Sequence, residues 1–564
     1  MTKVSPQEWH RRAYAALQAG DARAVQNHIV DSTKQHPINS AVWNTAGNLH
    51  LKMGDAAAAR DCFGKAANLD LRNMDYAVNH AIALSALGQH HDAIAALVPF
   101  NGPGSKSAVY CSSRANAERG AGNSAQAAQW YDRALTLEPN RVKALHGRAR
   151  VAIERGEPDA VQRVDRALSV NPGDADLWLA KAQALDVAGD TGGARQIAKQ
   201  LVDQAPAWIE GLKFLAQLRL GAGETNFTSH FAKAIQRVPQ DPAIPQAWSA
   251  VLAGLDFNEE AANVAANARK AFPQMEQFAF LDAIYSGSAG ENDHAEAIFA
   301  ALSVDTGERK LHEVRHRIRR KEYERAQSLL SAIFATQPWD ISAWALQGVV
   351  WRLTGDDRAE WLCGQDGLVT LKPLINADEI LPDAIPFLHG LHDGSPLPLG
   401  QSLRGGSQTR GHLFSRAEPI LARLHQAIVD TLETYRQGLP KRDNAHPLLR
   451  HRDASWKLAG SWSVRLTGGG DYHTAHIHPL GIISSALYLE LPGNESDDPM
   501  AGWLEVGRPA TDLQTNLDPI STVEPKAGHL ALFPSILYHG TRPFTGDRRM
   551  TVAFDVVTGK DAAQ

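Results

Sequence analysis

Along the first two thirds of the chain, apolar residues recur at steps of three and four, which places them on one face of a helix. The predicted helices come in pairs joined by short turns. In one pair the first helix carries Trp43, the second carries Phe63 and Ala66, and Gly54-Asp55 lies between them. Glycine suits the end of one helix and aspartate the start of the next. The pattern therefore predicts a series of helical hairpins.

Prolines set the length of the repeating unit. Five of them lie 33 or 34 residues apart, at Pro139, Pro172, Pro206, Pro239 and Pro273. Each closes a second helix, because proline lacks the amide hydrogen that a helix interior needs. Repetition at this length predicts a solenoid of stacked hairpins. Two units, 76–107 and 277–308, follow the pattern poorly.

The unit length, the order of helix, turn and helix, and the closing proline resemble the tetratricopeptide repeat. The resemblance covers residues 5–372, which is ten or eleven units. Small and aromatic residues within a unit are interpreted as packing between helices. Stacked hairpins of this kind form a concave surface that commonly binds peptides or proteins. We therefore expect a protein or peptide partner on the repeat array.

The helical pattern breaks down after residue 372. Residues 373–400 are crowded with proline, aspartate and glycine and are interpreted as a junction. A glycine-rich polar stretch at 404–411 is typical of an irregular loop. Residues 416–437 return to helical spacing and predict one more helix.

From residue 455 the period changes to two, because Trp462, Val464 and Leu466 alternate with polar residues. Further strands are predicted at 482–491, 503–506, 529–533 and 550–557. Many short strands separated by turns favour a barrel or a jelly roll.

The predicted architecture is multidomain α + β. An all-α tetratricopeptide solenoid at 5–372 and a junction at 373–400 precede a double-stranded β-helix, or jelly roll, with flanking helices at 401–557. A short tail follows at 558–564.

Charge and composition narrow the functional classes. The net charge is −5, and this lack of basic excess argues against a nucleic-acid partner. The three cysteines are far apart in sequence, so we expect no disulfide framework and a reducing compartment. There is no run of eighteen apolar residues, so we expect no membrane partner and a cytoplasmic protein.

Histidines mark the chemistry of the strand-rich region. His476 and His478 are two residues apart, so in an extended strand both imidazoles point the same way toward one ion. His539 follows a strand that ends at Phe533-Pro534 and can supply a third ligand from across a barrel. Together these residues predict a metal site.

A metal site of this kind suits oxygen activation with a keto acid. Iron(II) held by three protein ligands keeps its other positions open, two for the keto acid and one for O2. The far carboxylate of 2-oxoglutarate needs a permanently charged donor, and Arg549 provides a two-pronged one. Thr551 lies on the same face of the predicted strand and adds a hydroxyl. Arg548 is the rival to Arg549, but the alternation with Thr551 favours Arg549.

Four short motifs carry a family resemblance. They are H-x-H-P at 476–479, S-x-x-Y-L at 485–489, L-F-P-S-x-x-x-H at 532–539 and R-x-T-V-A-F at 549–554. They resemble the 2-oxoglutarate/iron(II)-dependent oxygenases, and most of all a bacterial branch with tetratricopeptide repeats ahead of the catalytic domain. The resemblance covers about 395–557 together with the repeats.

The resemblance implies a role for several residues. It makes His476 and His539 iron ligands, and it places Arg549, Thr551 and Tyr488 against 2-oxoglutarate. His478 departs from the pattern, because most of the superfamily has aspartate or glutamate there.

Because His478 stands where a carboxylate is usual, three arrangements of the metal ligands remain open. All three histidines bind the metal, or water takes the third place with His478 behind it, or a carboxylate such as Asp471 or Glu505 completes the site. His473 is expected on the opposite face from His476, in a surface or structural role.

Polar residues near the predicted site are candidates for contact with substrate. They are Arg404, Gln408 and Arg410 in the glycine-rich loop, and Arg465 in the first predicted strand. The alternative interpretation is that the loop is a solvated connection without a role in binding and that Arg465 faces water.

The function implied is a dioxygenase that uses Fe(II), 2-oxoglutarate and O2 and hydroxylates a protein or peptide recruited by the repeats, with release of succinate and CO2. Two alternatives stay open. One is a protein-interaction scaffold whose catalytic domain no longer turns over. The other is a cupin-like metalloenzyme that uses three histidines and no keto acid.

Overall fold

The computed structural model describes residues 4–393, 395, 402–409, 412–416, 418–467, 471–493 and 498–558. The chain divides into two compact units, and the boundary falls between Ala180 and Lys181. Each unit is described by itself.

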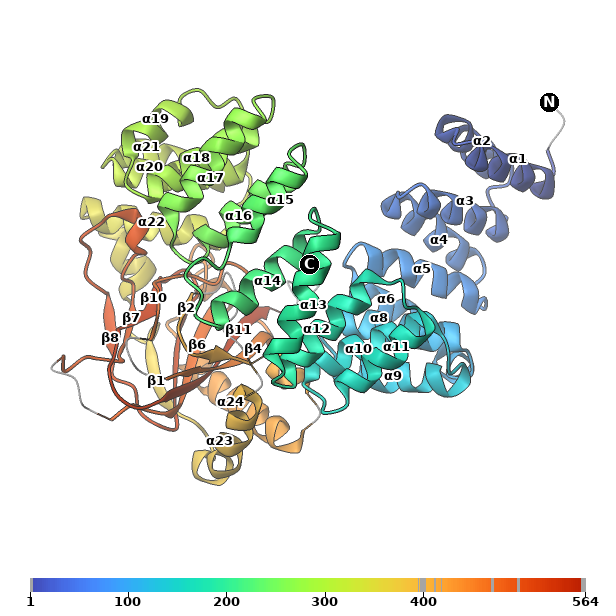
Figure 1. The fold of residues 1–564 in the computed structure, drawn as a ribbon. Helices are drawn as coiled ribbons and strands as arrows, with labels where there is room; N and C mark the ends of the chain where they lie inside the picture. Colours follow the sequence, from blue (N-terminus) through green and yellow to red (C-terminus); the bar gives the residue numbers. More distant parts are fainter. Residues whose placement is uncertain are drawn as a thin grey trace. The chain divides into compact units, whose positions relative to one another are not determined.

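The first unit is a series of antiparallel helical hairpins (Figure 1). Its helices are α1 (Pro6–Gln18), α2 (Ala22–Gln35), α3 (Ser40–Lys52), α4 (Ala56–Leu69), α5 (Met74–Ala86), α6 (His90–Leu97), α7 (Asn101–Gly104), α8 (Ala108–Gly120), α9 (Ser124–Leu137), α10 (Val142–Arg155) and α11 (Ala160–Val170). Helix α12 (Ala175–Val187) crosses the boundary between the units.

The α3–α4 hairpin shows how sequence dictates the repeat. Gly54 adopts a φ of +82°, which ends α3, and the Asp55 side chain then accepts a hydrogen bond from the Ala58 amide at the start of α4. A Cβ at Gly47 would lie 2.6 Å from the Phe63 ring, so only glycine allows the two helices this close. The predicted glycine–aspartate turn and the small-residue packing are both confirmed.

The second unit also begins with helical hairpins. Its helices are α13 (Thr191–Gln204), α14 (Ile209–Gly221), α15 (Ser229–Arg237), α16 (Ala243–Ala253), α17 (Asn258–Ala271), α18 (Glu276–Ser288), α19 (Asn292–Phe299), α20 (Gly307–Arg319), α21 (Tyr323–Phe334) and α22 (Ile341–Thr354). The poorly matching units 76–107 and 277–308 also form hairpins, but their second helices, α6 and α19, have only 8 residues each. Short second helices explain their weak pattern.

Strands occupy the C-terminal region. They are β1 (Thr370–Pro373), β2 (Leu403–Arg404), β3 (Ser407–Gln408), β4 (Trp456–Leu466), β5 (Tyr472–His473), β6 (Ile483–Glu490), β7 (Leu504–Val506), β8 (Ser521–Val523), β9 (His529–Pro534), β10 (His539–Thr541) and β11 (Arg549–Thr558). The described strands form a six-stranded sheet in the order β1-β9-β6-β11-β4-β3, a three-stranded sheet β10-β7-β8 and the pair β2-β5.

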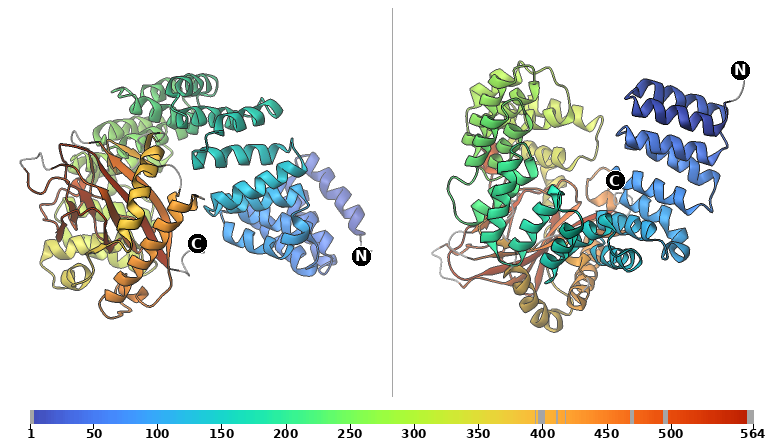
Figure 2. Two further views of the ribbon diagram at one scale, coloured as in Figure 1. Left: turned by 90° about the horizontal axis from the view of Figure 1, so that it is seen from below. Right: turned by 45° about the vertical axis from the view of Figure 1, so that its right-hand side comes forward.

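The large sheet is covered on both faces. Helices α23 (Ala377–Asp393) and α24 (Pro419–Gly438) lie along one face, where they share a hydrophobic core with Leu487 of β6 and Phe554 of β11 (Figure 2). On the other face a second cluster joins Tyr488 and Phe533 of the large sheet to Leu504 of the three-stranded sheet. The helical solenoid followed by a β-rich domain is confirmed, and the jelly-roll topology stays a prediction.

Structure and prediction differ at the junction. Residues 370–373 form β1, which pairs antiparallel with β9 and so belongs to the sheet. Helix α23 fills most of the expected junction and holds two prolines. The expected irregular loop at 404–411 carries β3 and the end of β2, because each pairs with a distant strand. The expected helix at 416–437 is α24, and the five predicted strands are confirmed.

Repeats of the second unit pack directly on the β-rich domain. The Arg315 guanidinium of α20 donates to both carboxylate oxygens of Asp512 at 2.6 and 2.7 Å and to the Tyr538 hydroxyl at 3.0 Å. Arg352 of α22 donates to the carbonyl oxygen of Gly507. These repeats therefore support the segment that leads into β10.

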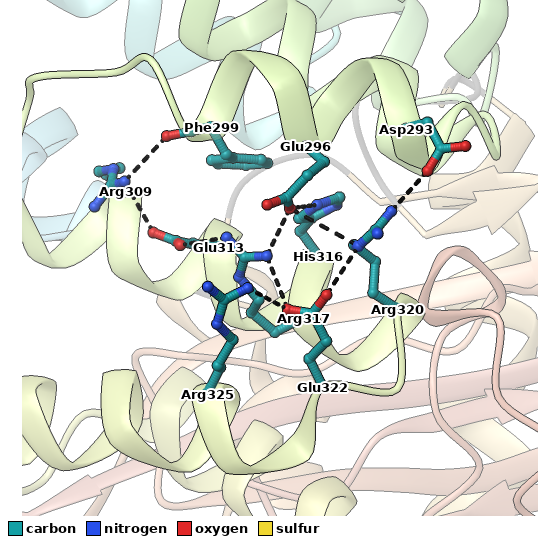
Figure 3. Close-up of polar contacts among 10 residues, drawn as sticks. All are labelled: Asp293, Glu296, Phe299, Arg309, Glu313, His316, Arg317, Arg320, Glu322 and Arg325. Carbon is teal, nitrogen blue, oxygen red and sulfur yellow. Dashed lines mark hydrogen bonds and ion pairs between the residues drawn. The ribbon is translucent and has the colours of Figure 1, made fainter.

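A charged network lies inside the repeats of α19 to α21 (Figure 3). Its centre is Arg317, which is only 5% exposed and contacts three carboxylates, those of Glu296, Glu313 and Glu322. The buried cation is thus fully paired with anions of its own chain.

Among the described helices, none has the length and apolar character that crossing a bilayer requires.

Candidate metal centre

Three histidines converge between the two sheets. The backbones of His476 and His539 exchange two hydrogen bonds, of 3.0 and 2.9 Å, which join the segment after β5 to β10. The Nε2 atoms of His476 and His478 lie 3.0 Å apart. One ring nitrogen from each of His476, His478 and His539 lies within 4.8 Å of the others. The structure brings together the three residues that the sequence singled out.

A hydrogen bond at Nδ1, the ring nitrogen that does not face the ion position, orients each imidazole. The Nδ1 of His476 lies 2.8 Å from the Thr474 carbonyl oxygen, and the Nδ1 of His539 lies 3.2 Å from that of Leu537. The Nδ1 of His478 contacts the Asp555 carboxylate. An oxygen acceptor at Nδ1 places the hydrogen there and leaves the Nε2 lone pair free. Three lone pairs are therefore available to one ion.

Two of the three imidazoles, those of His476 and His539, are neutral at ordinary pH. Burial and the neighbouring His478 lower the pKa of His476 to about 3. Burial and the neighbouring His476 hold the pKa of His539 well below its ordinary value. A neutral imidazole is the form that binds metal ions, so these two side chains can bind a cation without losing a proton.

The carboxylates proposed as alternative ligands have other partners. Asp471 accepts hydrogen bonds of 2.9 Å from the backbone and hydroxyl of Thr467. Glu505 contacts Arg508 and Arg542. Within the described part of the chain, the group that could hold a metal ion comprises the three histidines alone.

The histidines line a cavity of about 510 Å³. Leu504 and Phe533 contribute apolar walls, and Arg549 and Thr551 also face the cavity, as their predicted alternation requires. Gln408 lines it too. The cavity thus contains both halves of the predicted site.

Arg549 is buried without an anionic partner. It is 2% exposed, and its guanidinium lies 5.2 Å from the centre of the Tyr488 ring and 3.3 Å from the Thr541 hydroxyl. Among the described residues its Nε has no hydrogen-bond partner, and no carboxylate pairs with the guanidinium. Burial lowers the pKa of Arg549, yet an arginine side chain stays charged in proteins. A buried cation of this kind calls for an anion from outside.

The other predicted pocket residues have different fates. Arg404 pairs with Asp256 of the turn after α16, with N–O distances of 3.0 and 2.6 Å, and does not line the cavity. Arg465 pairs with Asp393 at 2.9 Å and likewise does not line it. Arg410 lies outside the described residues.

His473 faces the cavity, contrary to the expectation from alternation. The chain leaves strand geometry after β5, so the two-residue period does not continue from His473 to His476. Its Nδ1 lies 3.2 Å from the Ser402 hydroxyl, which is also 3.3 Å from His476 Nε2. Sequence reasoning missed Ser402 and Thr541 as site residues, because no motif marks them.

Comparison with protein families agrees with this geometry. Residues 460–555 match the family model described as "Putative 2OG-Fe(II) oxygenase". Residues 40–73 and 158–218 match models of the tetratricopeptide repeat. The chain is therefore similar to tetratricopeptide repeats in its N-terminal part and to this oxygenase family over residues 460–555. No curated protein matches it.

Solved structures resemble the helical part. A tetratricopeptide repeat protein from Parabacteroides merdae is 17% identical and aligns over 43% of this chain and 97% of its own, with a TM-score of 0.36. MamA from Desulfovibrio magneticus is 12% identical over 30% and 96% of the two chains, with a TM-score of 0.27. A repeat protein from Cytophaga hutchinsonii is 18% identical over 37% and 88%, with a TM-score of 0.29. Likenesses at this level say nothing of what this chain binds.

Proposed function

We propose that the C-terminal domain is an Fe(II)- and 2-oxoglutarate-dependent dioxygenase. His476, His478 and His539 hold the iron, and Arg549 holds the distal carboxylate of 2-oxoglutarate. One observation carries the proposal: a buried guanidinium without a described carboxylate partner shares one cavity with three converging imidazole nitrogens.

The donor atoms suit an iron ion. Two nitrogens, each about 2.1 Å from one ion and at a right angle, are roughly 3.0 Å apart. The Nε2 atoms of His476 and His478 have that separation. Imidazole is a good ligand for iron, and a site with few protein ligands leaves room for cosubstrates.

The chain's own residues would bind and orient 2-oxoglutarate. When bound, iron supplies the activation of O2 that couples the conversion of 2-oxoglutarate to succinate and CO2 with substrate hydroxylation. Arg549 offers a charged fork, and the hydroxyls of Thr541 and Thr551 line the same cavity and would add hydrogen bonds to a carboxylate. The Tyr488 ring lies against the guanidinium. Phe533 contributes an apolar wall to the same cavity and packs against the His539 ring.

A protein or peptide is the proposed substrate class. Tetratricopeptide repeats generally mediate protein–protein interaction, and here they precede the catalytic domain in one chain. Leu480 lines the cavity and is 89% exposed, so it offers an apolar contact at the opening of the cavity. We propose that the array recruits the polypeptide whose side chain enters the cavity.

Succinate formation tests the proposal. Purified protein with Fe(II), ascorbate and 2-oxoglutarate should form succinate slowly even without substrate. Arg549→Ala should weaken 2-oxoglutarate binding about 100-fold, because a charged hydrogen-bonding partner contributes up to ~3 kcal/mol. The matched control is Arg548→Ala, since Arg548 is adjacent but exposed. Equal 2-oxoglutarate affinity in the two variants would refute the role of Arg549.

The all-histidine donor set favours a second candidate, a metalloenzyme that uses no keto acid. It predicts tight metal binding without any binding of 2-oxoglutarate. A scaffold without turnover predicts no succinate under any of these conditions. The same measurements therefore separate all three functions.

A further inference from the structure

His478 is held from behind by one carboxylate. Asp555 of β11 accepts a hydrogen bond from His478 Nδ1, the ring nitrogen that faces away from the other two imidazoles. Among the described residues, no other side-chain hydrogen bond of Asp555 is found. Asp555 lies outside the group of nitrogens that converge on the ion position. Its role is therefore toward His478, not toward the ion directly.

The backbone around Asp555 is built for this contact. The register of β11 against β4 shifts between Asp555 and Val556, where Ala459 is the extra residue on β4. The residue opposite Asp555 on β4 is Gly460, and a Cβ there would lie 3.9 Å from a carboxylate oxygen of Asp555. A Cβ at Gly481 would lie 3.3 Å from the Asp555 Cβ, so a larger residue there would press on it.

The other side of the His478 ring is also fixed. The Trp462 ring lies against it, with ring centres 5.6 Å apart and planes tilted by 33°. Packing by Trp462 limits tilting of the imidazole, and the hydrogen bond to Asp555 selects its rotation about χ2. Together the two contacts aim Nε2 into the cavity.

The negative charge of Asp555 also affects the charge balance of a bound metal ion. Three neutral imidazoles leave both charges of a divalent ion uncompensated in a buried cavity, which is costly. Asp471 and Glu505 are occupied elsewhere, by Thr467 and by two arginines. Asp555 is the carboxylate that contacts a ligand ring, and a carboxylate behind a histidine makes that imidazole a stronger donor.

We propose that Asp555 is a positioning residue of the metal centre. It fixes His478 with Nε2 toward the ion, and it supplies through the imidazole the negative charge that an all-histidine ligand set lacks. This inference rests on the proposed metal role of the three histidines.

Metal titration of the full-length protein tests it without any turnover. Co(II) is the probe, because both its affinity and its visible spectrum report on the ligands. Asp555→Ala should weaken Co(II) binding about 10- to 100-fold and alter the spectrum, the usual effect of losing such a partner. Asp555→Asn should lose less Co(II) affinity, because its amide oxygen still accepts the hydrogen bond from His478 Nδ1 although the negative charge is gone.

Two further variants make the result specific. Asp471→Ala removes a nearby carboxylate that contacts Thr467, and it should bind Co(II) as the wild-type protein does. His539→Ala should bind far more weakly than any aspartate variant. Thermal unfolding of each metal-free variant checks that it is folded. If Asp555→Ala does not fold, the affinity of Asp555→Asn for Co(II) tests the proposal.

The outcomes separate this inference from the proposed function. Asp555→Ala with wild-type affinity, while His539→Ala loses the metal, would overturn the role of Asp555 and leave the metal centre standing. An equal loss in Asp471→Ala would also overturn it. Wild-type affinity in Asp555→Asn alone would overturn the charge contribution. A wild-type protein that binds no Co(II) would refute the metal centre itself.

Discussion

Two buried arginines in the second unit have opposite surroundings. Arg317, in the repeats, contacts Glu296 at 2.5 Å, Glu322 at 2.9 Å and Glu313 at 3.0 Å (Figure 3). Arg549, in the β-rich domain, is as deeply buried but has no carboxylate partner among the described residues.

The pKa values express the same contrast. Burial lowers the pKa of both guanidinium groups, and at Arg317 the hydrogen bond to Glu313 and the charge of Glu296 more than reverse this. At Arg549 no anion does so, and its pKa stays below the ordinary value. Under the proposed function, the unbalanced charge at Arg549 is the one kept for a ligand.

Loss of Arg317 gives the largest expected change. Arg317→Met leaves three carboxylates close together without their cation. The free energy of unfolding should fall by about 3–5 kcal/mol, the usual result of breaking a buried ion pair. Denaturant unfolding measures it. Arg325→Met is the matched control, because Arg325 contacts Glu322 but is 65% exposed, and it should change stability by less than about 1 kcal/mol.

Acid should weaken the fold through buried histidines of both regions. Burial lowers the pKa of His230 in the repeats and of His446 in the β-rich domain to about 4. The unfolded chain takes up protons below about pH 6.5 while these native imidazoles do not, so stability falls as pH drops from about 6.5 to 4. The expected slope is at most ~1.4 kcal/mol per pH unit for each histidine.

Denaturant midpoints between pH 4 and 7 check this titration. His446→Gln should reduce the slope, because one titrating group is removed. A slope unchanged by the substitution would show that His446 takes up its proton in the folded protein.

Arg549 gives the smallest expected change in stability. Arg549→Met replaces an unpaired buried cation with an apolar side chain of similar length, so the free energy of unfolding should change by less than about 1 kcal/mol or rise. A loss as large as that of Arg317→Met would mean that Arg549 stabilises the fold, and the contrast between the two arginines would disappear.

Local patterns in the sequence predicted much of this molecule. The glycine–aspartate turn at Gly54 and the alternation of Arg549 and Thr551 depend on neighbours in the chain, and both are confirmed. Strand β1 was not predicted, because it exists through pairing with β9, more than a hundred residues away. The prolines in α23 obscured a helix that packing against the sheet stabilises.

At the site, prediction found the residues with motifs and missed those placed by tertiary structure. His473 turns into the cavity because the strand ends beside it. Asp555 reaches His478 from a strand 77 residues further along, so the contact depends on the pairing of distant segments. Arg404 meets Asp256 of a repeat, a contact that depends on how the repeats pack on the sheet.

Metal-dependent binding of 2-oxoglutarate tests the central claim most directly. In calorimetric titrations of the Co(II)-loaded protein, 2-oxoglutarate should bind one to one, and Arg549→Met should weaken its affinity about 100-fold while Arg548→Met leaves it unchanged. Co(II) binding itself should be the same in all three proteins. No binding by the wild-type protein, or equal affinity in Arg549→Met, would contradict the account.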